Sequence, residues 1–509
     1  MSNMFMRKYY IFIMATAILL MSPLYSGAQS KEFKLGQWTE IHNGIVKELS
    51  RSYVDSLPVD KMMRKGVDAM LEQLDPYTVY IPEEENEDLQ MMLSKTYGGI
   101  GAIIHKKKDG NVIINEPYYG SPAQKYGLQC GDEILEIDGV PTIGLETKES
   151  SDRMKGKPGT TVVFKVKKVR TGDTLDVPVI RERIHFPDIE YAGMLNDTTG
   201  YILQSGFTEG VAQQVNEKVL ELKSQGMKRL VLDLRGNGGG LMSEAINIIS
   251  LFVPKGSLAV SSKGKGQMKE FHTQTEPIDT NTPITILIDG GSASASEIVS
   301  GGLQDLGRAT IKGKTSFGKG LVQSIRPLPY NGQMKVTTAK YYTPSGRCVQ
   351  GVGVKPDVEI DIPSYSRLVY SLVLSGVIDQ YVLQFAREHE SIPAVEDFHF
   401  SDADFEDFVA FAKTQEFDYR SSAKATFDKM KEELEEDGLV QVMSEELTAL
   451  EKALEMDKER FIRLKKDEII PFIEEEIATR YWWQEAGVKV RLRYDQQLKA
   501  ALLYIATEL

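Results

Sequence analysis

A run of small residues containing three serines, GSASASE at 291–297, directly follows the apolar segment 284–288. A serine hydroxyl is a poor nucleophile unless a base lies beside it. Lys319 follows between two glycines, and a Ser–Lys pair is one form that an activated serine takes. A lysine can act as a base near neutral pH only when burial lowers its pKa. By itself, the serine run also fits close helix packing or a phosphate cradle at a helix N-terminus.

Further blocks surround these residues. They are LDLRGNGGGL (232–241), SASASEI (292–298), LQDLGRAT (303–310), TSFGKGLVQS (315–324) and TTAKYYTPSGR (337–347). Taken together and in this order, they closely resemble the carboxyl-terminal processing proteases, also called tail-specific proteases. With the PDZ-like stretch described below, the resemblance covers about residues 40–362, and the C-terminal helical region lies outside it.

The resemblance implies a role for three side chains. Ser294 would be the nucleophile, Lys319 the general base, and Gln323 the residue that orients the lysine. Phe317 and Leu321 flank the lysine in sequence, and we expect them to form the apolar wall that lowers its pKa.

The oxyanion of a tetrahedral intermediate needs hydrogen-bond donors. We expect the N–H of Ala295, at the start of a helix, to be one donor, and the N–H of Gly239 to be the other, with Gly240 as the alternative. Gly238 stands where the family usually has proline, so the sequence leaves open which glycine donates.

Other catalytic arrangements have less support. Asp305 matches an acid of the family, for which a structural and a catalytic role both stay open. A histidine-based triad is an alternative, although no histidine lies near the serine run: His272 is the closest in sequence, and His185 lies much further before it. With six histidines, no His-Glu-x-x-His pattern and no cysteine cluster, the sequence predicts neither a metal nor a cofactor.

Residues 95–183 change to short strands and resemble a PDZ domain of the bacterial protease type. The resemblance rests on GSPAQKYGLQCGDEILEIDGV at 120–140. Before the first strand, the N–H groups of Gly99, Ile100 and Gly101 are expected to bind the C-terminal carboxylate of a peptide. A glycine-rich turn without a ligand is the alternative. Where the family often has LRG, this chain has MKG at 154–156, and lysine lacks the forked donors of arginine.

Strand, glycine-rich turn and helix occur twice between residues 230 and 305, which is the unit of an α/β layered core. The sequence therefore predicts a mixed α/β protease core with an inserted PDZ domain and helical flanks. The expected parts are a signal peptide (1–28), an N-terminal helical region (29–94), the PDZ-like domain (95–183), the protease core (184–362) and a C-terminal helical region (363–509).

The N-terminus predicts export. Arg7 and Lys8 precede the apolar run 9–24, and the small residues at 26–28 suit a signal peptidase. An uncleaved membrane anchor is the alternative. We expect a periplasmic protein, with a membrane-anchored form possible. Cys130 and Cys348 are too far apart in sequence to form a disulfide framework.

With 73 acidic and 60 basic residues, the net charge of −13 argues against a nucleic-acid partner. We expect an exported serine endopeptidase that cleaves proteins near free C-termini, with homo-oligomer or adaptor contacts through its helical flanks. A catalytically inactive scaffold and a serine esterase for small substrates are the alternatives. The PDZ-like stretch argues against the esterase.

Overall fold

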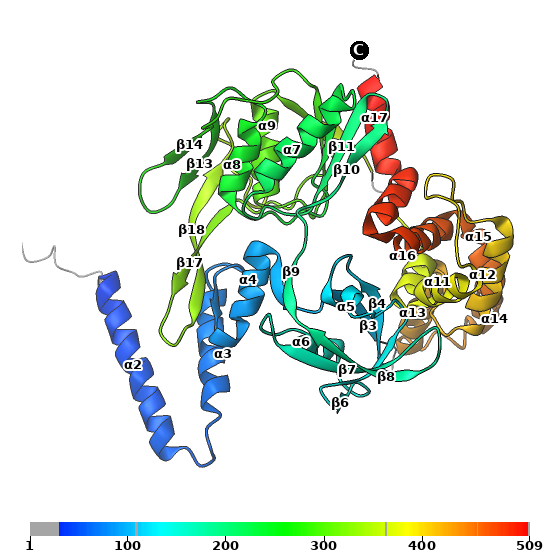
Figure 1. Cartoon of the computed structure of the whole chain (residues 1–509). Helices are drawn as coiled ribbons and strands as arrows, with labels where there is room; N and C mark the ends of the chain where they lie inside the picture. The colour runs from blue at the N-terminus through cyan, green and yellow to red at the C-terminus, as the bar shows by residue number, and fades with distance from the viewer. Residues whose placement is uncertain (1–29, 107–109, 362–363, 456, 507–509) are drawn as a thin grey trace, which may run out of the picture. The chain divides into compact units, whose positions relative to one another are not determined.

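The computed structural model describes residues 30–106, 110–361, 364–455 and 457–506. The predicted signal peptide lies outside these residues. The chain divides into two compact units, one ending at Tyr80 and the other beginning at Ile81 (Figure 1). The first unit contains α2 (Lys31–Ser52) and α3 (Val59–Glu72), and β1 (Val79–Ile81) spans the division.

A six-stranded sheet forms the protease core. Its order is β10 (Ile189–Asn196), β11 (Thr199–Gln204), β12 (Arg229–Asp233), β15 (Ile284–Ile288), β16 (Ala309–Gly313) and β19 (Val358–Glu359). β10 pairs antiparallel with β11, and the other neighbours are parallel. Every residue of β15 is buried, as expected for a parallel strand covered on both faces.

Helices from distant parts of the chain cover the two faces of this sheet. On one face lie α7 (Val211–Ser224), α8 (Met242–Ser250) and α9 (Ala295–Asp305), whose apolar residues share a core with Ile286 and Ile288. Leu287 points the other way and packs with Leu498 and Ala501 of α17 (Gln496–Ala506). In Figure 1 the red helix α17 accordingly runs beside β10 and β11. The end of the chain thus completes the core of the protease domain.

The PDZ domain is an insertion between two short paired strands, β2 (Thr96–Gly99) and β9 (Glu182–His185). Its sheet has the order β3 (Ala102–Lys106), β4 (Val112–Pro117), β5 (Glu133–Ile137), β7 (Thr161–Lys167) and β8 (Thr174–Ile180), and β6 (Val140–Pro141) pairs with β5. α5 (Pro122–Lys125) and α6 (Thr147–Met154) complete the domain. β3 is therefore an edge strand of the PDZ sheet.

The remaining strands make a smaller antiparallel layer. β13 (Leu258–Lys263) pairs with β14 (Lys269–His272) and β18 (Gln333–Tyr342), and β17 (Leu321–Pro327) pairs with β18. The 3₁₀ helix η2 (Glu83–Glu85) and α4 (Asn86–Ser94) precede the PDZ domain.

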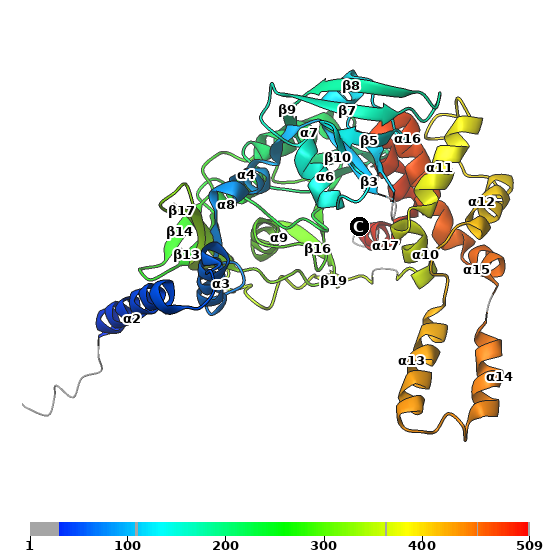
Figure 2. The ribbon, with the colours of Figure 1, turned by 90° about the horizontal axis from the view of Figure 1, so that it is seen from below.

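Eight helices after residue 366 form the C-terminal helical region. Besides α17, they are α10 (Arg367–Leu374), α11 (Val377–Glu388), α12 (Asp402–Thr414), α13 (Ser422–Glu436), α14 (Ser444–Leu454), α15 (Lys458–Leu464) and α16 (Lys466–Tyr494). α13 and α14 project as a hairpin in Figure 2. Within the described part of the chain, no single helix is both long enough and apolar enough to cross a membrane. The helices α10 and α11, which meet at a bend, reach that length and apolar character only when taken together. Both helices contribute residues to a buried core.

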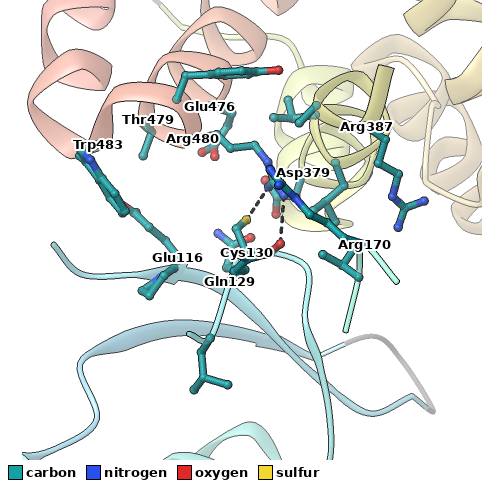
Figure 3. Close-up of a pocket in the computed structure, with 18 of the residues that line it drawn as sticks. Glu116, Gln129, Cys130, Arg170, Asp379, Arg387, Glu476, Thr479, Arg480 and Trp483 are labelled. Carbon is teal, nitrogen blue, oxygen red and sulfur yellow. Dashed lines mark hydrogen bonds between the residues drawn. The ribbon is translucent and has the colours of Figure 1, made fainter. Parts of the chain in front are cut away.

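A cavity of about 990 Å³ lies where the PDZ domain meets α11 and α16 (Figure 3). The Arg480 guanidinium on α16 donates to the carbonyl oxygen of Cys130 (3.1 Å) and also contacts its Sγ. Burial raises the pKa of Glu116 to about 7 and that of Glu476 to about 8. These two carboxyl groups, from opposite sides of the contact, both line the cavity. Cys130 and Cys348 are both free thiols.

Candidate active site

The turn between β15 and α9 presents Ser294. This residue precedes the first turn of α9 with φ 56° and ψ −112°, a backbone conformation that costs a non-glycine residue about 1–3 kcal/mol. The Tyr341 hydroxyl donates to its carbonyl oxygen (3.0 Å) and helps to hold this conformation. Strained residues of this kind concentrate at active sites.

The two neighbouring serines are buried and have structural hydrogen bonds. The Ser292 hydroxyl donates to the carbonyl oxygen of Leu234 (2.7 Å), and the Ser296 hydroxyl donates to that of Asn237 (2.9 Å). Both side chains are 0% exposed, whereas Ser294 is partly exposed. Of the three serines in the run, Ser294 therefore has the hydroxyl that a substrate can reach.

A buried carboxylate joins this turn to the lysine loop. Glu297 is 0% exposed, and its Oε2 accepts from the N–H of Ser294 and from the N–H of Lys319, both at 2.8 Å. Its Oε1 accepts from the Gly318 N–H (2.7 Å) and the Ser316 hydroxyl (2.6 Å). One side chain thus fixes the backbone of both predicted catalytic residues.

Our sequence analysis did not single out Glu297. The signal was present in the sequence, because a serine followed three residues later by glutamate is the capping-box pattern of a helix start. The pattern predicts a helix cap, but it does not predict the two further bonds to the loop of Lys319, which comes from a distant part of the chain.

Lys319 lies half-buried in a tight loop. Gly318 has φ 89°, and a Cβ placed on Gly320 would lie 2.6 Å from the amide nitrogen of Gln350, so both glycines are required by the geometry. Burial lowers the pKa of Lys319, and the positive charge of Lys335 lowers it further, while Glu297 opposes the shift. The direction is the one that a lysine base needs.

The expected apolar wall beside Lys319 is only partly present. Phe317 is 55% exposed, so it can shield the lysine only in part. The backbone N–H of Phe317 donates to the carbonyl oxygen of Ser292 (3.0 Å), which anchors the loop. Leu321 is partly buried.

Gln323 lies on β17, next to an irregularity in the pairing of β17 with β18. Such bulges change the direction of a side chain and are frequent beside active sites. Its Nε2 is buried and has no hydrogen-bond partner among the residues that the structure describes. A buried amide donor without an acceptor is costly, so a carbonyl oxygen of a bound substrate or the neutral amine of Lys319 would be a favourable partner.

The glycine-rich loop after β12 lies directly against the start of α9. A Cβ placed on Gly239 (φ 95°) would lie 2.6 Å from the Ala293 carbonyl oxygen and 2.8 Å from the Ala295 nitrogen. As the first residue of α9, Ala295 has an N–H without an acceptor inside the helix. The Gly239 N–H donates to Oδ1 of Asn237 (2.9 Å), so an oxyanion would compete with that amide for it.

Asp305 has a structural position at the end of α9. It accepts from the Ser345 N–H (3.0 Å) and pairs with Arg347, which holds the turn after β18. Burial alone would raise the pKa of Asp305, but the hydrogen bonds from Ser345 and Thr343 and the charge of Arg347 lower it below its ordinary value. These contacts favour the structural role that the sequence left open.

The predicted carboxylate-binding loop connects β2 to the edge strand β3. Gly99 ends β2, Ile100 is 3% exposed, and Gly101 has φ 72°. The Gly101 N–H lies near the Tyr97 hydroxyl and partly offsets the rise in its pKa that burial causes, and the Tyr97 ring lies so close to Gly99 that a Cβ there would be 2.6 Å from its Cε2. In this structure the Tyr97 hydroxyl thus lies beside one of the donors predicted for a peptide carboxylate.

A forked donor is present beside residues 154–156 although the sequence there has lysine. Arg181, which is 9% exposed, donates through Nε to the carbonyl oxygen of Met154 (3.1 Å) and through a terminal nitrogen to that of Arg153 (2.8 Å). Its guanidinium lies against Gly156. An arginine from the end of the PDZ domain therefore caps α6 at this segment.

Comparison with known proteins agrees with this geometry. The family model described as peptidase family S41 matches residues 198–360, and a PDZ domain model matches residues 113–168. The carboxy-terminal-processing protease of Bartonella bacilliformis is 34% identical over 362 residues, which cover 69% of this chain and 81% of that protein. The chain belongs to peptidase family S41. This S41 peptidase is a serine protease of the carboxy-terminal processing type, and it carries a PDZ domain.

Two further proteins are similar to this S41 peptidase. The carboxy-terminal processing protease CtpA of Bacillus subtilis is 30% identical over 361 residues, covering 71% of this chain and 75% of that one. A solved structure of a photosystem II D1 C-terminal processing protease is 26% identical, covers 64% of this chain and 86% of that one, and has a TM-score of 0.38.

The C-terminal helical region also matches a family model, described as the C-terminal helical domain of a probable PDZ-protease, over residues 368–505. Our sequence analysis placed this region outside any resemblance, and this finding corrects that interpretation. A helical surface rich in Glu and Lys carries few distinctive motifs, because many sequences satisfy the same amphipathic pattern.

Proposed function

We propose that this S41 peptidase is exported, cleaves by a Ser–Lys mechanism and receives its substrates by their C-terminal tails. The observation that carries the mechanism is the double attachment of Glu297. Its carboxylate binds the N–H of Ser294, the serine whose hydroxyl is accessible, and the N–H of Lys319, whose pKa is lowered by burial.

In the proposed reaction, neutral Lys319 removes the proton from the Ser294 hydroxyl as Oγ bonds to the scissile carbonyl carbon. The Ala295 N–H stabilises the resulting oxyanion, and the Gly239 N–H adds a second bond when it leaves Asn237. Protonated Lys319 then gives its proton to the departing amine, which leaves an acyl-enzyme. Water then gives a proton to Lys319 and attacks the ester carbonyl carbon. The bond between that carbon and Oγ breaks, Oγ takes the proton back from Lys319, and the peptide leaves with a new carboxyl terminus. Gln323 orients the lysine in both halves of the reaction.

For tail recognition, we propose that a peptide adds to the free edge of β3 with its carboxylate at Gly99, Ile100 and Gly101. The position of β3 at the sheet edge and the glycine-rich turn before it support this mode. The substrates would be proteins with free C-termini, and the helical flanks remain candidate surfaces for oligomer or adaptor contacts. Export to the periplasm rests on the signal-peptide pattern of residues 1–28.

The test uses a peptide substrate with a free C-terminus. Ser294→Ala should abolish cleavage with little change in Tm, whereas Ser292→Ala and Ser296→Ala should lower Tm because each removes a buried hydrogen bond. Lys319→Arg should also be inactive, because a guanidinium stays protonated. In the wild-type enzyme, kcat should rise with pH as Lys319 loses its proton. An active Ser294→Ala, or an unchanged pH profile in Lys319→Arg, would reject the mechanism.

A further inference from the structure

The loop that carries Gly239 is poorly determined by its own sequence. Residues 235–240 contain four glycines, three of which have φ between 67° and 155°. Glycine has more conformational freedom than any other residue, so a loop of this composition needs outside anchors to hold one shape. An oxyanion donor is effective only when it is held in place before the reaction.

Several anchors come from the protease core itself. The Gly236 N–H donates to Oδ1 of Asp289 (2.9 Å), and the Asn237 side chain donates to the carbonyl oxygen of Gln204 (2.7 Å). At the far end, the Leu241 N–H donates to the carbonyl oxygen of Phe207 (2.8 Å). These bonds hold the middle and the end of the loop.

The first residue of the loop is anchored from the C-terminal helical region. Arg235 donates through one terminal nitrogen to Oδ1 of Asp495 (3.2 Å) and to Oε1 of Gln497 (2.9 Å), and through the other to Oδ2 of Asp495 (2.6 Å). This is a bidentate pair, the geometry that gives a guanidinium a defined plane. The Arg235 and Asp495 side chains are 18% and 13% exposed, so solvent screens the pair little.

The Asp495 carboxylate is itself held in place. It lies at the junction of α16 and α17, where its Oδ1 accepts from the Leu498 N–H (2.8 Å) as a helix cap. Leu498 is 2% exposed and belongs to the core between α17 and the sheet. The position of Asp495 is therefore fixed by the packing of α17 against the sheet.

Arg235 also pairs with its near neighbour Asp233, which is 1% exposed and accepts from the Tyr201 hydroxyl (2.7 Å). Burial alone would lower the pKa of Arg235, but the two carboxylates raise it above its ordinary value. Because Asp233 remains, removing Asp495 leaves no buried charge without a partner. Asp233 is the last residue of β12 and lies only two residues before Arg235, so this pair does not tie the loop to a distant part of the chain.

We propose that Asp495 is a positioning residue of the protease, which acts through Arg235 to hold the loop of Gly239 against the start of α9. The C-terminal helical region is then part of the catalytic apparatus and not only an attached domain. This inference rests on the proposed function, in which the Gly239 loop serves the oxyanion.

The experiment compares Asp495→Ala, Asp495→Asn and Asp495→Glu in the full chain. Asp495→Ala should lower kcat about tenfold, because an imprecise donor loses part of the 10²–10³-fold effect of one oxyanion bond. KM should stay within about twofold, since substrate binding in the ground state does not use the donor. Asp495→Glu should recover part of kcat. Tail affinity, measured in the Ser294→Ala background, should not change.

Glu474→Gln is the matched control. Glu474 is a buried carboxylate on α16 that accepts from the Phe400 N–H (2.7 Å) and the Tyr494 hydroxyl (2.9 Å), within the helical region. It should lower Tm and leave kcat unchanged. A wild-type kcat in Asp495→Ala overturns the inference. It is also overturned if Asp495→Ala and Glu474→Gln lose the same amount of Tm and Asp495→Ala loses no more kcat than Glu474→Gln.

If Asp495→Ala does not fold, Asp495→Asn and Gln497→Ala provide the same comparison with smaller changes. Cleavage by Ser294→Ala would show that the proposed mechanism is wrong. An inactive Ser294→Ala together with a wild-type kcat in the Asp495 variants would leave the mechanism intact and reject this inference alone.

Discussion

At the scale of residues, buried hydrogen bonds hold the backbone of the candidate site. Ser294 keeps an unfavourable φ because Tyr341 and Glu297 bind its carbonyl and its N–H. Glu297 accepts four hydrogen bonds. A carboxylate can accept all of them, because its two oxygens carry acceptor sites only. We therefore regard Glu297 as the link between the backbone of Ser294, the proposed nucleophile, and that of Lys319, the proposed base.

The substitution Glu297→Gln tests this link. The amide keeps one acceptor oxygen and places an N–H₂ group against backbone donors, so kcat should fall by about 10–100-fold. The charge of Glu297 raises the pKa of Lys319, and its removal should therefore move the acid limb of the pH–rate profile to lower pH. The measurement is kcat as a function of pH for both enzymes.

A purely structural role would lower kcat through loss of folded enzyme and leave the acid limb where it is. An unmoved limb with a reduced Tm would therefore contradict the electrostatic part of this prediction. Glu244→Gln is a suitable control, because Glu244 is also buried and accepts from a helix N–H, that of Ala212 (3.0 Å), away from the serine turn.

At the scale of elements, the two strand–turn–helix units bring their turns to the same edge of the sheet. β12 and β15 are parallel neighbours, so the loops after them lie side by side. The PDZ domain connects through the β2–β9 pair, and Tyr97 lies within that pair, stacked on Phe186 with ring centroids 5.6 Å apart. The tyrosine therefore connects the predicted carboxylate-binding loop to the segment that leads into the protease core.

Replacing Tyr97 by phenylalanine should strengthen tail binding. The change removes the hydroxyl that lies beside the Gly101 N–H, so an arriving carboxylate no longer has to displace it. We expect the Kd of a peptide with a free C-terminus, measured in the Ser294→Ala background, to fall about threefold to tenfold, as expected for one modest hydrogen bond.

The control is Tyr118→Phe, which removes a neighbouring hydroxyl and leaves the Tyr97–Gly101 contact in place. An unchanged or weaker affinity in Tyr97→Phe would show that the hydroxyl does not compete with the tail. An amidated peptide should bind both variants poorly, because it lacks the charge that the loop N–H groups would bind.

At the scale of the molecule, the C-terminal helical region contacts both other parts of the second unit. α17 covers one face of the protease sheet, and α16 contacts the PDZ domain through Arg480. The region around this second contact is rich in titratable groups. Besides Glu116 and Cys130 of the PDZ domain, the cavity walls carry Arg170, Asp379, Arg387, His389, Glu390, Glu476 and Arg480, and the adjoining pocket adds Lys95, Glu190, Glu475 and Arg491.

We predict that the contact between the PDZ domain and α16 weakens as pH rises. Burial raises the pKa of Glu116 and Glu476 from 4.5 to about 7 and about 8, so the docked state binds protons more tightly than the separated state. Their contribution is fully present below the ordinary pKa and is lost as pH rises through the two raised values. Arg480 offsets part of the repulsion between the ionised groups.

The measurement is hydrogen exchange of β4 and of residues 477–484, corrected for the intrinsic pH dependence of exchange. Protection should fall between about pH 4 and pH 9 in the wild-type protein, the range from the ordinary pKa of the two carboxyl groups to their raised values. It should stay constant in the double variant Glu116→Gln, Glu476→Gln. Equal loss of protection in both proteins would mean that other groups control the contact.

Much of the site was predictable from local sequence. A buried strand followed by small residues defines a sharp turn into a helix, so the position of Ser294 before α9 follows from residues 284–298 alone. The same holds for β12 and its glycine loop, and for the PDZ turn at Gly99–Gly101. Each of these turns is shaped by residues that are close together in the sequence. A tight turn admits only certain residue types, such as glycine and serine, so the turn can be recognised from the sequence.

Tertiary structure decided which distant groups surround these turns. Glu297 reaches Lys319, Tyr341 holds Ser294, and Asp495 reaches Arg235 across 260 positions of the chain. The exposure of Phe317 shows the same limit, because adjacency in sequence did not predict how far it shields the lysine. Charge and hydrogen bonding act through space, and a single sequence carries no record of which side chains the packed core brings together.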